Sequence, residues 1–299
     1  MDLSQIRSFN AVARHGSFSA AAKALGVTQP GLTKAVRRLE ASLACSLFVR
    51  QPRGVTLTPQ GQALLRHASL LDIQLRDARE EVRSLDRGAV GELRIGAGPS
   101  WLSRALPRIV AEMAAEFPGL RFQVVGGFNG SLMQALRVGD LDLVVSALPD
   151  RSPAGLRAIP LTTDTISVVA RRDHPLRAKR KPQPESTLAY SWALPGRDVL
   201  SRQRLEALFR VAGLEPPTPK IESDSISFIV AVLRESDMLS FATSQLLRGE
   251  TGGVAPLAIP GLSMTRSAGI LFRSSAGITP ATQALIDAAK RVAQQLGDN

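Results

Sequence analysis

The sequence has few of the residues from which metal sites and catalytic centres are commonly built. Cys45 is the only cysteine among 299 residues, so no intramolecular disulfide can form. The three histidines, His15, His67 and His174, lie in separate segments, with no spacing typical of a metal cluster or a Cys–His pair. No P-loop occurs, and GAGPS at 96–100 lacks the third glycine of a dinucleotide-binding fingerprint. We therefore expect no metal, no cofactor and no catalytic function, and treat an enzyme as the first alternative.

Long apolar runs are missing as well. The longest, Phe228 to Leu233, is far shorter than the roughly 20 residues that cross a bilayer. The N-terminal MDLSQIRSFNAV does not place a basic region before a continuous apolar stretch, so we see no secretory signal. The single cysteine fits a reducing compartment. We therefore expect a cytoplasmic protein without a membrane partner.

Positive charge is present in excess and unevenly placed, for a net charge of +11. Residues 1–58 hold eight Lys or Arg against two acids, whereas residues 59–91 hold five of each. The remaining 208 residues hold 24 bases and 19 acids. A small, strongly basic N-terminal unit is typical of proteins that bind a polyanion. Charge alone does not distinguish DNA from RNA or an anionic membrane.

The stretch 17–40, SFSAAAKALGVTQPGLTKAVRRLE, predicts two helices joined by a tight turn. Ser17 and Thr28 are candidate N-caps, and Gly26 suits the positive φ that ends a helix. Pro30 falls in the first turn of the second helix, where a missing N–H costs nothing. The second helix has an apolar stripe with helical spacing, formed by Leu32, Val36, Leu39 and Leu43.

The other side of that second helix carries polar and basic side chains that suit base edges and phosphates. Because a helix fits the major groove, we predict that it reads DNA; the alternative is an amphipathic surface helix with solvated charges. Residues 47–61 predict a hairpin around a Pro52–Gly54 turn, which we interpret as a wing rather than a solvated turn. The predicted DNA-binding residues are Thr28, Gln29, Pro30, Gly31, Thr33, Lys34, Arg37, Arg38, Arg50 and Arg53.

A long helix is predicted over 59–87, followed by a hinge with two glycines at 86–91. Its apolar residues alternate in steps of four and three, which is typical of a coiled-coil seam. We predict that residues 59–91 form a linker and dimerisation helix; the alternative is a helix packed on its own domain. The predicted seam residues are Leu64, Ala68, Leu71, Leu75, Ala78, Val82 and Leu85.

From Glu92 onward, short apolar strands alternate with helices, which predicts a parallel α/β sheet. Two similar α/β units joined by two crossover strands predict a bilobed domain with a cleft. The expected fold is an N-terminal all-α winged helix-turn-helix with a long linker helix, followed by an α/β domain like a bilobed periplasmic binding protein. The expected bounds are 1–58 for the winged domain, about 92–163 and 266–299 for lobe I, and about 164–265 for lobe II of the 92–299 domain.

These patterns resemble the LysR-type transcriptional regulator family. The resemblance rests on the 17–40 stretch, LFVR at 47–50 and RGVTLTPQG at 53–61, and more weakly on VGDLDLVV at 138–145 and RRDHPL at 171–176. It covers essentially the whole chain, and YSWALPGRD at 190–198 is loosely similar to the branch that regulates sugar uptake and aromatic-acid catabolism. The resemblance implies a ligand-responsive regulator that binds a partly palindromic site in double-stranded promoter DNA. It also implies a homodimer or homotetramer, a dimer of dimers, with RNA polymerase as a candidate partner.

Four residues depart from the family pattern without removing a DNA-facing group. Gly31 stands where Ala or Ser is usual, which lowers helix propensity but lets the backbone approach phosphate. Thr33 replaces the usual Ser and keeps a hydroxyl, and Gln60 replaces a usual Ala. Ala44 stands where Gly is common at the end of the recognition helix, which predicts a less relaxed turn.

A ligand of a bilobed α/β domain is expected at the carboxyl ends of the strands, between the lobes. The strands that end near Gly98 and Gly127 precede helix N-termini, whose free N–H groups favour an anion. The resemblance places effector contacts on Ser100, on Asn129 and on the 195–197 loop. Arg197 could pair a carboxylate or sulfonate in a bidentate manner.

We therefore predict a small organic acid, sugar-derived or aromatic, as the effector. Trp101 suits an aromatic wall of the site or a plain core contact, and Ser225 suits a ligand contact or only a helix cap. The predicted effector-binding residues are Pro99, Ser100, Trp101, Gly127, Asn129, Pro195, Arg197 and Ser225. Two further alternatives are a solute-binding protein, which would need export, and a nonspecific DNA-binding protein, which would not need a cleft domain.

Overall fold

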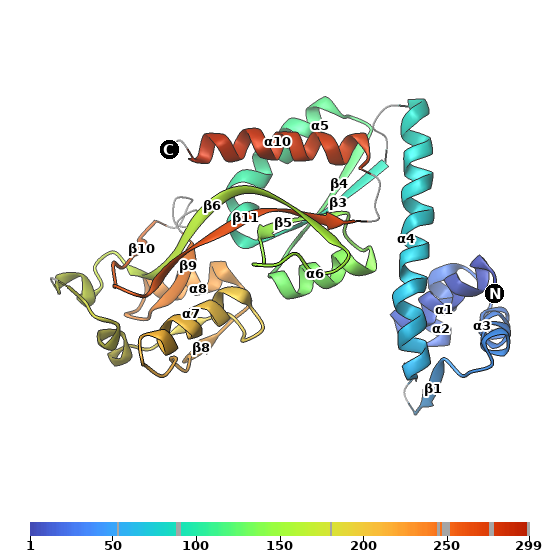
Figure 1. Ribbon diagram of the computed structural model, residues 1–299, viewed down its shortest axis with the longest axis horizontal. Helices are drawn as coiled ribbons and strands as arrows, with labels where there is room; N and C mark the ends of the chain where they lie inside the picture. Colours follow the sequence, from blue (N-terminus) through green and yellow to red (C-terminus); the bar gives the residue numbers. More distant parts are fainter. Residues whose placement is uncertain are drawn as a thin grey trace. The chain divides into compact units, whose positions relative to one another are not determined.

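The computed structural model describes residues 1–52, 54–87, 91–179, 181–243, 246, 252–274 and 278–297. The chain divides into two compact units, Met1–Glu80 and Glu81–Asn299. Figure 1 colours the chain from its blue N-terminal unit to its red C-terminal helix. Among the described residues, no helix is long and apolar enough to cross a membrane.

The N-terminal unit is a winged helix-turn-helix. Its elements are α1 (Leu3–His15), α2 (Phe18–Leu25), α3 (Gln29–Leu43), β1 (Phe48–Gln51), β2 (Gly54–Leu57) and the first part of α4 (Pro59–Arg87). Ser17 and Thr28 cap α2 and α3, accepting from the N–H groups of Ala20 and Gly31, and Gly26 adopts the left-handed conformation that ends α2. These caps confirm the helix boundaries predicted from the sequence.

Two adjoining apolar clusters hold this unit together, and Phe48 of the hairpin contacts both. Its ring centroid lies 5.3 Å from that of Phe9 and 5.8 Å from that of Phe18. The predicted α3 stripe is buried at Leu32, Val36 and Leu39, whereas Leu43 is 38% exposed, so the stripe ends one turn earlier than expected. Gly54 has a φ of 130° and its hairpin turn packs on Gly16, whose carbonyl accepts the Val55 N–H at 2.9 Å.

The C-terminal unit is built on a seven-stranded sheet in the order β10-β6-β11-β5-β3-β4, with β9 also paired to β6. Its strands are β3 (Gly91–Ala97), β4 (Leu120–Gly126), β5 (Leu143–Ala147), β6 (Leu156–Arg171), β9 (Ser240–Thr243), β10 (Val254–Pro256) and β11 (Ser263–Arg273). The expectation of a parallel sheet was wrong in part. β3 pairs in parallel with β4 and β5, but β6 and β11 are antiparallel because each runs through both lobes in opposite directions.

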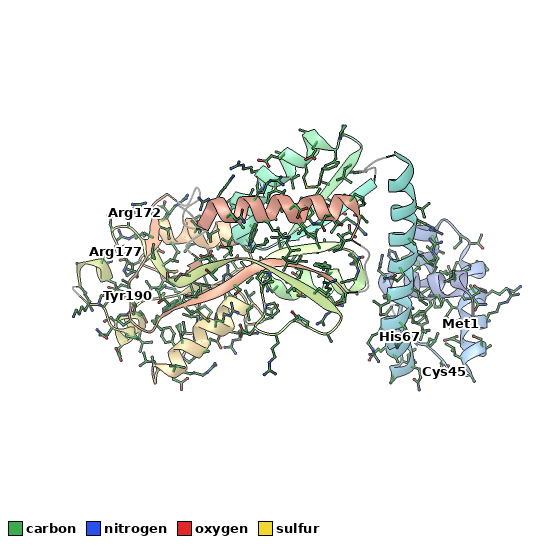
Figure 2. The ribbon with its side chains drawn as sticks, turned by 45° about the horizontal axis from the view of Figure 1, so that its top comes forward. Met1, Cys45, His67, Arg172, Arg177 and Tyr190 are labelled. Atoms are coloured by element: carbon green, nitrogen blue, oxygen red, sulfur yellow. The ribbon has the colours of Figure 1, made fainter. Side chains whose placement is uncertain are left out.

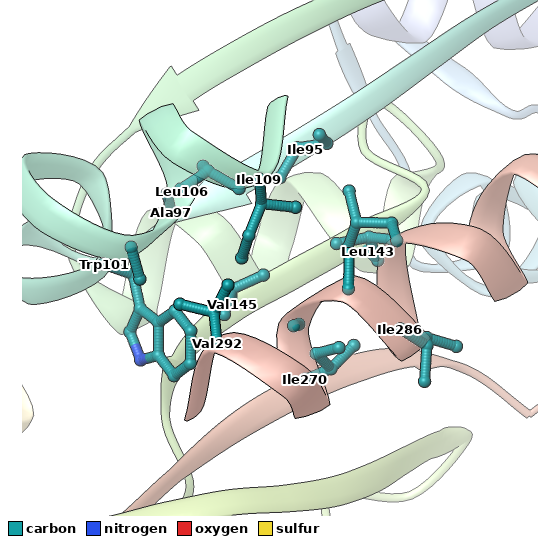
Figure 3. Packing of buried hydrophobic residues seen from close by; sticks show 14 of the residues in the cluster. Ile95, Ala97, Trp101, Leu106, Ile109, Leu143, Val145, Ile270, Ile286 and Val292 are labelled. Carbon is teal, nitrogen blue, oxygen red and sulfur yellow. The ribbon is translucent and has the colours of Figure 1, made fainter. Parts of the chain in front are cut away.

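Helices cover both faces of lobe I, as side-chain alternation along a strand requires. Leu143 and Val145 of β5 face η1 (Trp101–Ala105), α5 (Leu106–Glu116) and α10 (Pro280–Gly297), and Figure 3 shows this core from close by. Val144 faces the other way, toward α6 (Asn129–Val138). Figure 1 shows α5 and α10 on one face of the sheet and α6 on the other.

Lobe II follows the same rule. Val168 of β6 packs with α7 (Leu200–Val211), and Val169 packs with α8 (Ile226–Arg234). Its remaining elements are the short parallel pair β7 (Ala193–Leu194) and β8 (Ile221–Glu222) and two 3-10 helices, η2 (Pro175–Ala178) and η3 (Pro184–Ala189). Within 244–251 the structure describes only Leu246, and residues 88–90 of the expected hinge at 86–91 lie outside the described residues.

Candidate DNA interface and effector cleft

One open, concave surface of the N-terminal unit carries most of the predicted DNA-binding residues. It is lined by Gln29, Pro30, Thr33, Lys34, Arg37, Arg38 and Ala41, all on α3. Lys34, Arg37 and Arg38 are exposed and form no ion pair with any residue that the structure describes. Local sequence spacing on a single helix is therefore sufficient to bring these cations together.

The structure adds a residue that the sequence did not indicate. Ser19 of α2 donates its hydroxyl proton to the Oε1 atom of Gln29 at 2.8 Å, which orients the Gln29 amide on the exposed face. Thr28 and Gly31 belong to the N-terminal turn of α3, where the Gly31 N–H donates to Thr28 Oγ1 at 3.3 Å. A side chain at position 31 would start 3.0 Å from that oxygen, so glycine keeps this turn uncrowded.

The hairpin expected as a wing is present, with β1 and β2 paired antiparallel. Arg50 lies on β1 opposite Val55. Arg53 lies outside the described residues, so its expected place at the tip of the wing stays a prediction.

The predicted dimerisation seam divides into two parts along α4. Ala68 is fully buried and Leu64 partly buried in the apolar core of the N-terminal unit, and the Asn10 amide donates to the Ala68 carbonyl at 2.9 Å. The N-terminal part of α4 therefore packs on its own domain, which was the alternative interpretation considered for the whole helix. Farther along, Leu71 is 41% exposed and Val82 is 65% exposed, with Leu75 half-buried and Ala78 exposed between them. The side chain of Leu85 lies outside the described atoms.

The C-terminal unit has a partly open cavity lined by residues of both lobes, with room of about 50 Å³ for the centres of water-sized molecules. Of the predicted effector-binding residues, Pro99, Ser100, Trp101 and Asn129 line it, whereas Gly127, Pro195, Arg197 and Ser225 do not. Other lining residues are Phe128, Ser146, Ile166, Val199, Leu200, Ser201, Ile226, Phe241, Thr243 and Arg266. The cavity wall therefore combines apolar side chains with polar ones, which are Ser100, Asn129, Ser146, Ser201, Thr243 and Arg266.

Three of these polar residues, Ser100, Thr243 and Arg266, join the two lobes. The hydroxyl oxygens of Ser100 in lobe I and Thr243 in lobe II lie 2.9 Å apart, and both residues are buried. Arg266 of β11 donates from Nη2 to Ser100 Oγ at 3.3 Å, and the same atom lies 3.7 Å from Asp164 Oδ2. Three potential hydrogen-bond donors from distant parts of the chain thus converge on one point.

Arg266 is the charged group closest to this point. Its side chain is 11% exposed, and its Nε has no hydrogen-bond partner among the described residues. Burial lowers the pKa of the Arg266 guanidinium, an effect that the neighbouring Asp164 carboxylate opposes and Arg204 reinforces. A buried guanidinium with an unused donor favours an anionic partner.

The predicted residues that miss the cavity have other roles. Arg197 is exposed, and its carbonyl accepts from Gln203 Nε2 at 3.3 Å. Ser225 caps α8 by accepting the Phe228 N–H at 3.3 Å, which was its alternative interpretation. The Gly127 N–H donates to the Ala97 carbonyl at 3.1 Å. Pro195 is buried, and its carbonyl accepts from Arg202 at 3.5 Å.

Trp101 and Asn129 contact the cavity but are held by lobe I. Trp101 is 1% exposed and packs in the lobe I core, as Figure 3 shows. The Asn129 amide donates to the Ala147 carbonyl at 2.8 Å and accepts from Ser146 Oγ at 2.7 Å. Both side chains therefore form a fixed wall.

An exposed basic helix on one unit and a cavity with a mostly buried cation in the other are typical of one class of protein, the DNA-binding regulator that responds to a small molecule. The model of the LysR substrate binding domain matches residues 86–294, and that of the bacterial regulatory helix-turn-helix protein of the lysR family matches residues 3–62. The chain belongs to the LysR family of transcriptional regulators. Because this family consists of regulators, the expectation that the chain is not an enzyme is confirmed.

Several characterised proteins are similar over most of their length. The SDS degradation transcriptional activation protein of a Pseudomonas species is 35% identical over 289 residues, covering 95% of this chain and 94% of that protein. The regulator PcaQ of Agrobacterium fabrum is 34% identical, covering 78% and 76%, and the regulator GalR of Pseudomonas putida is 32% identical, covering 97% and 71%.

Solved structures share the fold of the whole chain. A full-length OxyR variant from Pseudomonas aeruginosa superposes with a TM-score of 0.72 at 24% identity, covering 97% of this chain and 98% of that one. Full-length CbnR complexed with its target DNA superposes with a TM-score of 0.64 at 22% identity, covering 98% and 100%. The predicted winged helix-turn-helix, linker helix and bilobed α/β domain are thereby confirmed as the fold.

Proposed function

We propose that this regulator senses a small organic anion in the cavity between its lobes. The observation that carries the proposal is the convergence of Ser100, Thr243 and Arg266 on one buried point. A carboxylate, sulfonate or sulfate oxygen placed there could accept from both hydroxyls and from the guanidinium. Such an anion would also use the Arg266 Nε donor, which has no hydrogen-bond partner among the described residues.

The rest of the cavity wall supports an effector with an apolar body. Phe128, Val199, Leu200 and Phe241 line it, and burial of apolar ligand surface contributes roughly 25 cal/mol per Å². The relative named for SDS degradation supports the same chemistry, because SDS joins a sulfate ester to an alkyl chain. We therefore extend the expected effector class from sugar-derived or aromatic acids to amphiphilic organic anions.

Ligand binding at this point would alter contact between the lobes. The Ser100–Thr243 contact joins lobe I directly to lobe II, so an anion inserted there changes the free energy of lobe closure. Lobe closure would change the spacing of the DNA-binding units in an oligomer, and this change would alter transcription. RNA polymerase remains a candidate partner in that step, and access to promoter DNA requires a cytoplasmic location.

On the DNA side, α3 enters the major groove of a partly palindromic site, where Gln29 and Thr33 face base edges and Lys34, Arg37 and Arg38 face phosphates. Two copies pair through the exposed part of α4 from Leu71 to Val82, and a dimer of dimers would bind an extended site. Leu71→Asp places a charge in this seam and should give monomers in sedimentation. An unchanged oligomer would contradict the pairing.

The effector proposal is tested by a thermal-shift screen against alkyl carboxylates, alkyl sulfonates, alkyl sulfates and sugar acids. Compounds with an anionic head and an apolar body should raise the Tm of the wild-type chain. Ser100→Ala and Thr243→Val should each weaken binding about tenfold or more, because each removes a hydrogen bond to a charged ligand. Arg197→Ala is the matched control outside the cavity and should bind normally.

Two outcomes would contradict this placement of the site. The first is a loss of binding in the Arg197→Ala variant while Ser100→Ala binds normally. The second is a Tm response to sugar acids alone, which would exclude the apolar body.

A further inference from the structure

The net charge of the effector domain is concentrated in one short segment. Residues 92–299 hold 24 Lys or Arg and 19 acids, and residues 171–181 alone hold six of those bases and one acid. The rest of the domain therefore holds equal numbers, 18 of each. The whole net charge of +5 lies in the eleven residues RRDHPLRAKRK. Such a concentration is not needed for solubility, which interspersed charges provide.

This segment is fixed on lobe II rather than loosely attached. His174 is 1% exposed, its Nδ1 accepts the Leu176 N–H at 3.1 Å, and its Nε2 lies 3.1 Å from the Asp237 carbonyl. Its ring centroid lies 4.6 Å from that of Tyr190. Leu176 is fully buried in the lobe II core. Figure 2 shows Arg172, Arg177 and Tyr190 at one end of the domain.

The basic side chains of the segment differ in what they contact. Arg171 is paired with Asp237 at 2.8 Å, and Arg177 donates from Nη2 to the Ala255 carbonyl at 2.7 Å. The side chains of Arg172, Lys179 and Lys181 are exposed and form no ion pair or hydrogen bond with the described residues. We call these three residues the basic tip.

The positive charges of the 171–181 segment affect one another, as the pKa of Arg177 shows. The pKa of Arg177 is lowered, first by burial and second by the positive charge of Arg172, and Asp173 only partly opposes this. A group of like charges whose repulsion is only partly offset by neighbouring carboxylates is favourable for binding a polyanion, because the remaining repulsion is relieved on binding.

We propose that the basic tip contacts the phosphate backbone of double-stranded DNA that the same molecule already holds through α3. Among the described residues from 172 to 183, none that is exposed is aromatic or branched apolar, which disfavours a protein partner that would need such anchors. Contacts to phosphate carry no direct sequence information, so the proposed contact is independent of sequence. A second contact on the same DNA molecule is intramolecular, so even a weak one contributes to binding of a duplex long enough to span both sites.

The test compares salt dependence for two DNA lengths, using the full chain throughout. An operator fragment is first selected in vitro from random duplexes, and a second fragment extends it by several helical turns on each side. The triple variant Arg172→Gln/Lys179→Gln/Lys181→Gln removes the basic tip without touching the anchors His174 and Leu176. Its matched control, Arg137→Gln/Lys220→Gln/Arg291→Gln, removes three exposed cations elsewhere in the effector domain.

The salt slope is the slope of the logarithm of the DNA-binding constant against the logarithm of salt concentration. For the extended fragment this slope should be shallower in the tip variant by roughly 2 to 3, because each phosphate contact contributes about 0.9. Its slope on the short fragment should equal that of the wild-type chain, and the control should match the wild type on both fragments. Equal slopes for tip variant and control on the extended fragment would overturn the proposal. If these salt slopes were equal but the tip variant activated transcription less than the control, the tip would bind an acidic protein instead. Normal effector-induced Tm shifts in the tip variant would show that the cavity is unaffected.

Discussion

The cations of the α3 surface and Arg266 in the cavity between the lobes stand in opposite environments. Lys34, Arg37 and Arg38 are exposed and come from one helical turn and its neighbour. Arg266 is nearly buried, and it meets Ser100 and Asp164, which lie 166 and 102 positions away in the chain. The first arrangement leaves full charges exposed where a polyanion can reach them, whereas the second holds one charge in a mostly buried position beside a carboxylate.

This difference indicates which property, folding stability or binding, a substitution at each surface should change. An exposed cation contributes little to folding, so its replacement should alter binding alone. A buried cation beside a buried carboxylate is part of the fold as well as of the site, so its replacement should alter both. The predictions below exploit that contrast.

The largest effect is expected from Arg266→Gln. This change removes the cation that lies 3.7 Å from the fully buried Asp164 side chain, and the free energy of unfolding should fall by about 3 kcal/mol. Arg37→Gln, the exposed counterpart on α3, should change stability by less than about 0.5 kcal/mol while weakening DNA binding. Urea denaturation of both variants measures the contrast. Adding Asp164→Asn to Arg266→Gln should restore part of the loss; equal stabilities for the two single variants would remove the distinction.

A smaller effect is expected on sequence reading. Gln29→Ala should reduce the discrimination of the correct base pair by about 1 to 3 kcal/mol in each half-site, with stability unchanged. Ser19→Ala removes only the 2.8 Å hydrogen bond that orients Gln29, so it should show the same defect at smaller size. Competition binding with single-base variants of the operator measures both. An unaltered ratio of specific to nonspecific affinity in Gln29→Ala would contradict the base-reading role.

The turn after α3 provides a test on backbone energetics. Ala44 has a φ of 50°, and no other non-glycine residue of the described chain has a positive φ. Ala44→Gly should stabilise the chain by up to about 1 kcal/mol, because glycine adopts this conformation without steric cost. Gly26→Ala is the reverse control at φ 66°, where an added Cβ meets no atom within 4 Å, so any destabilisation there arises from the backbone. Thermal unfolding should move in opposite directions for the two variants.

The smallest effect concerns pH. Burial lowers the pKa of His174, opposed by Asp237 and reinforced by Arg171 and Arg177. Because the folded pKa lies below the unfolded value of about 6.5, stability is full above that pH and is lost as pH falls through the window beneath it. His174→Asn keeps an acceptor for the Leu176 N–H but does not titrate, so its stability should be flat in this window. If the free energy of unfolding changed with pH equally in the wild type and in His174→Asn, the pH dependence would arise from another group.

Local patterns were sufficient for the DNA-binding unit. Ser17, Thr28 and Gly26 mark helix ends by backbone chemistry that depends on the next few residues only, and α3 brings its cations together by helical periodicity. Helical periodicity also predicted that Leu43 is buried, which was wrong, because the prediction assumed that the apolar stripe of α3 is buried for its full length. It also treated Leu64 and Ala68 as equivalent to Leu71, although the first two are covered by α1 and the hairpin.

The effector cavity illustrates the limit of such patterns. Ser100 and Asn129 were identifiable because each follows a strand end at a helix N-terminus, and both line the cavity. Arg197 was chosen for its charge in a loop near the expected cleft, yet it is exposed and outside the lining. Arg266 gave no local signal, since a single arginine in a strand of mixed polarity is compatible with a surface position.

The sequence by itself determined the family, the helix-turn-helix, the basic face of α3, the length of α4 and the bilobed α/β plan. These properties depend on short-range periodicity, capping and charge, which a linear chain displays directly. Only the tertiary structure decided that β6 and β11 run antiparallel, that the first part of the α4 seam lies in its own core, and that Arg266 rather than Arg197 meets Ser100. The physical reason is that burial and ion pairing depend on which distant segments pack together, and no spacing along the chain encodes that packing.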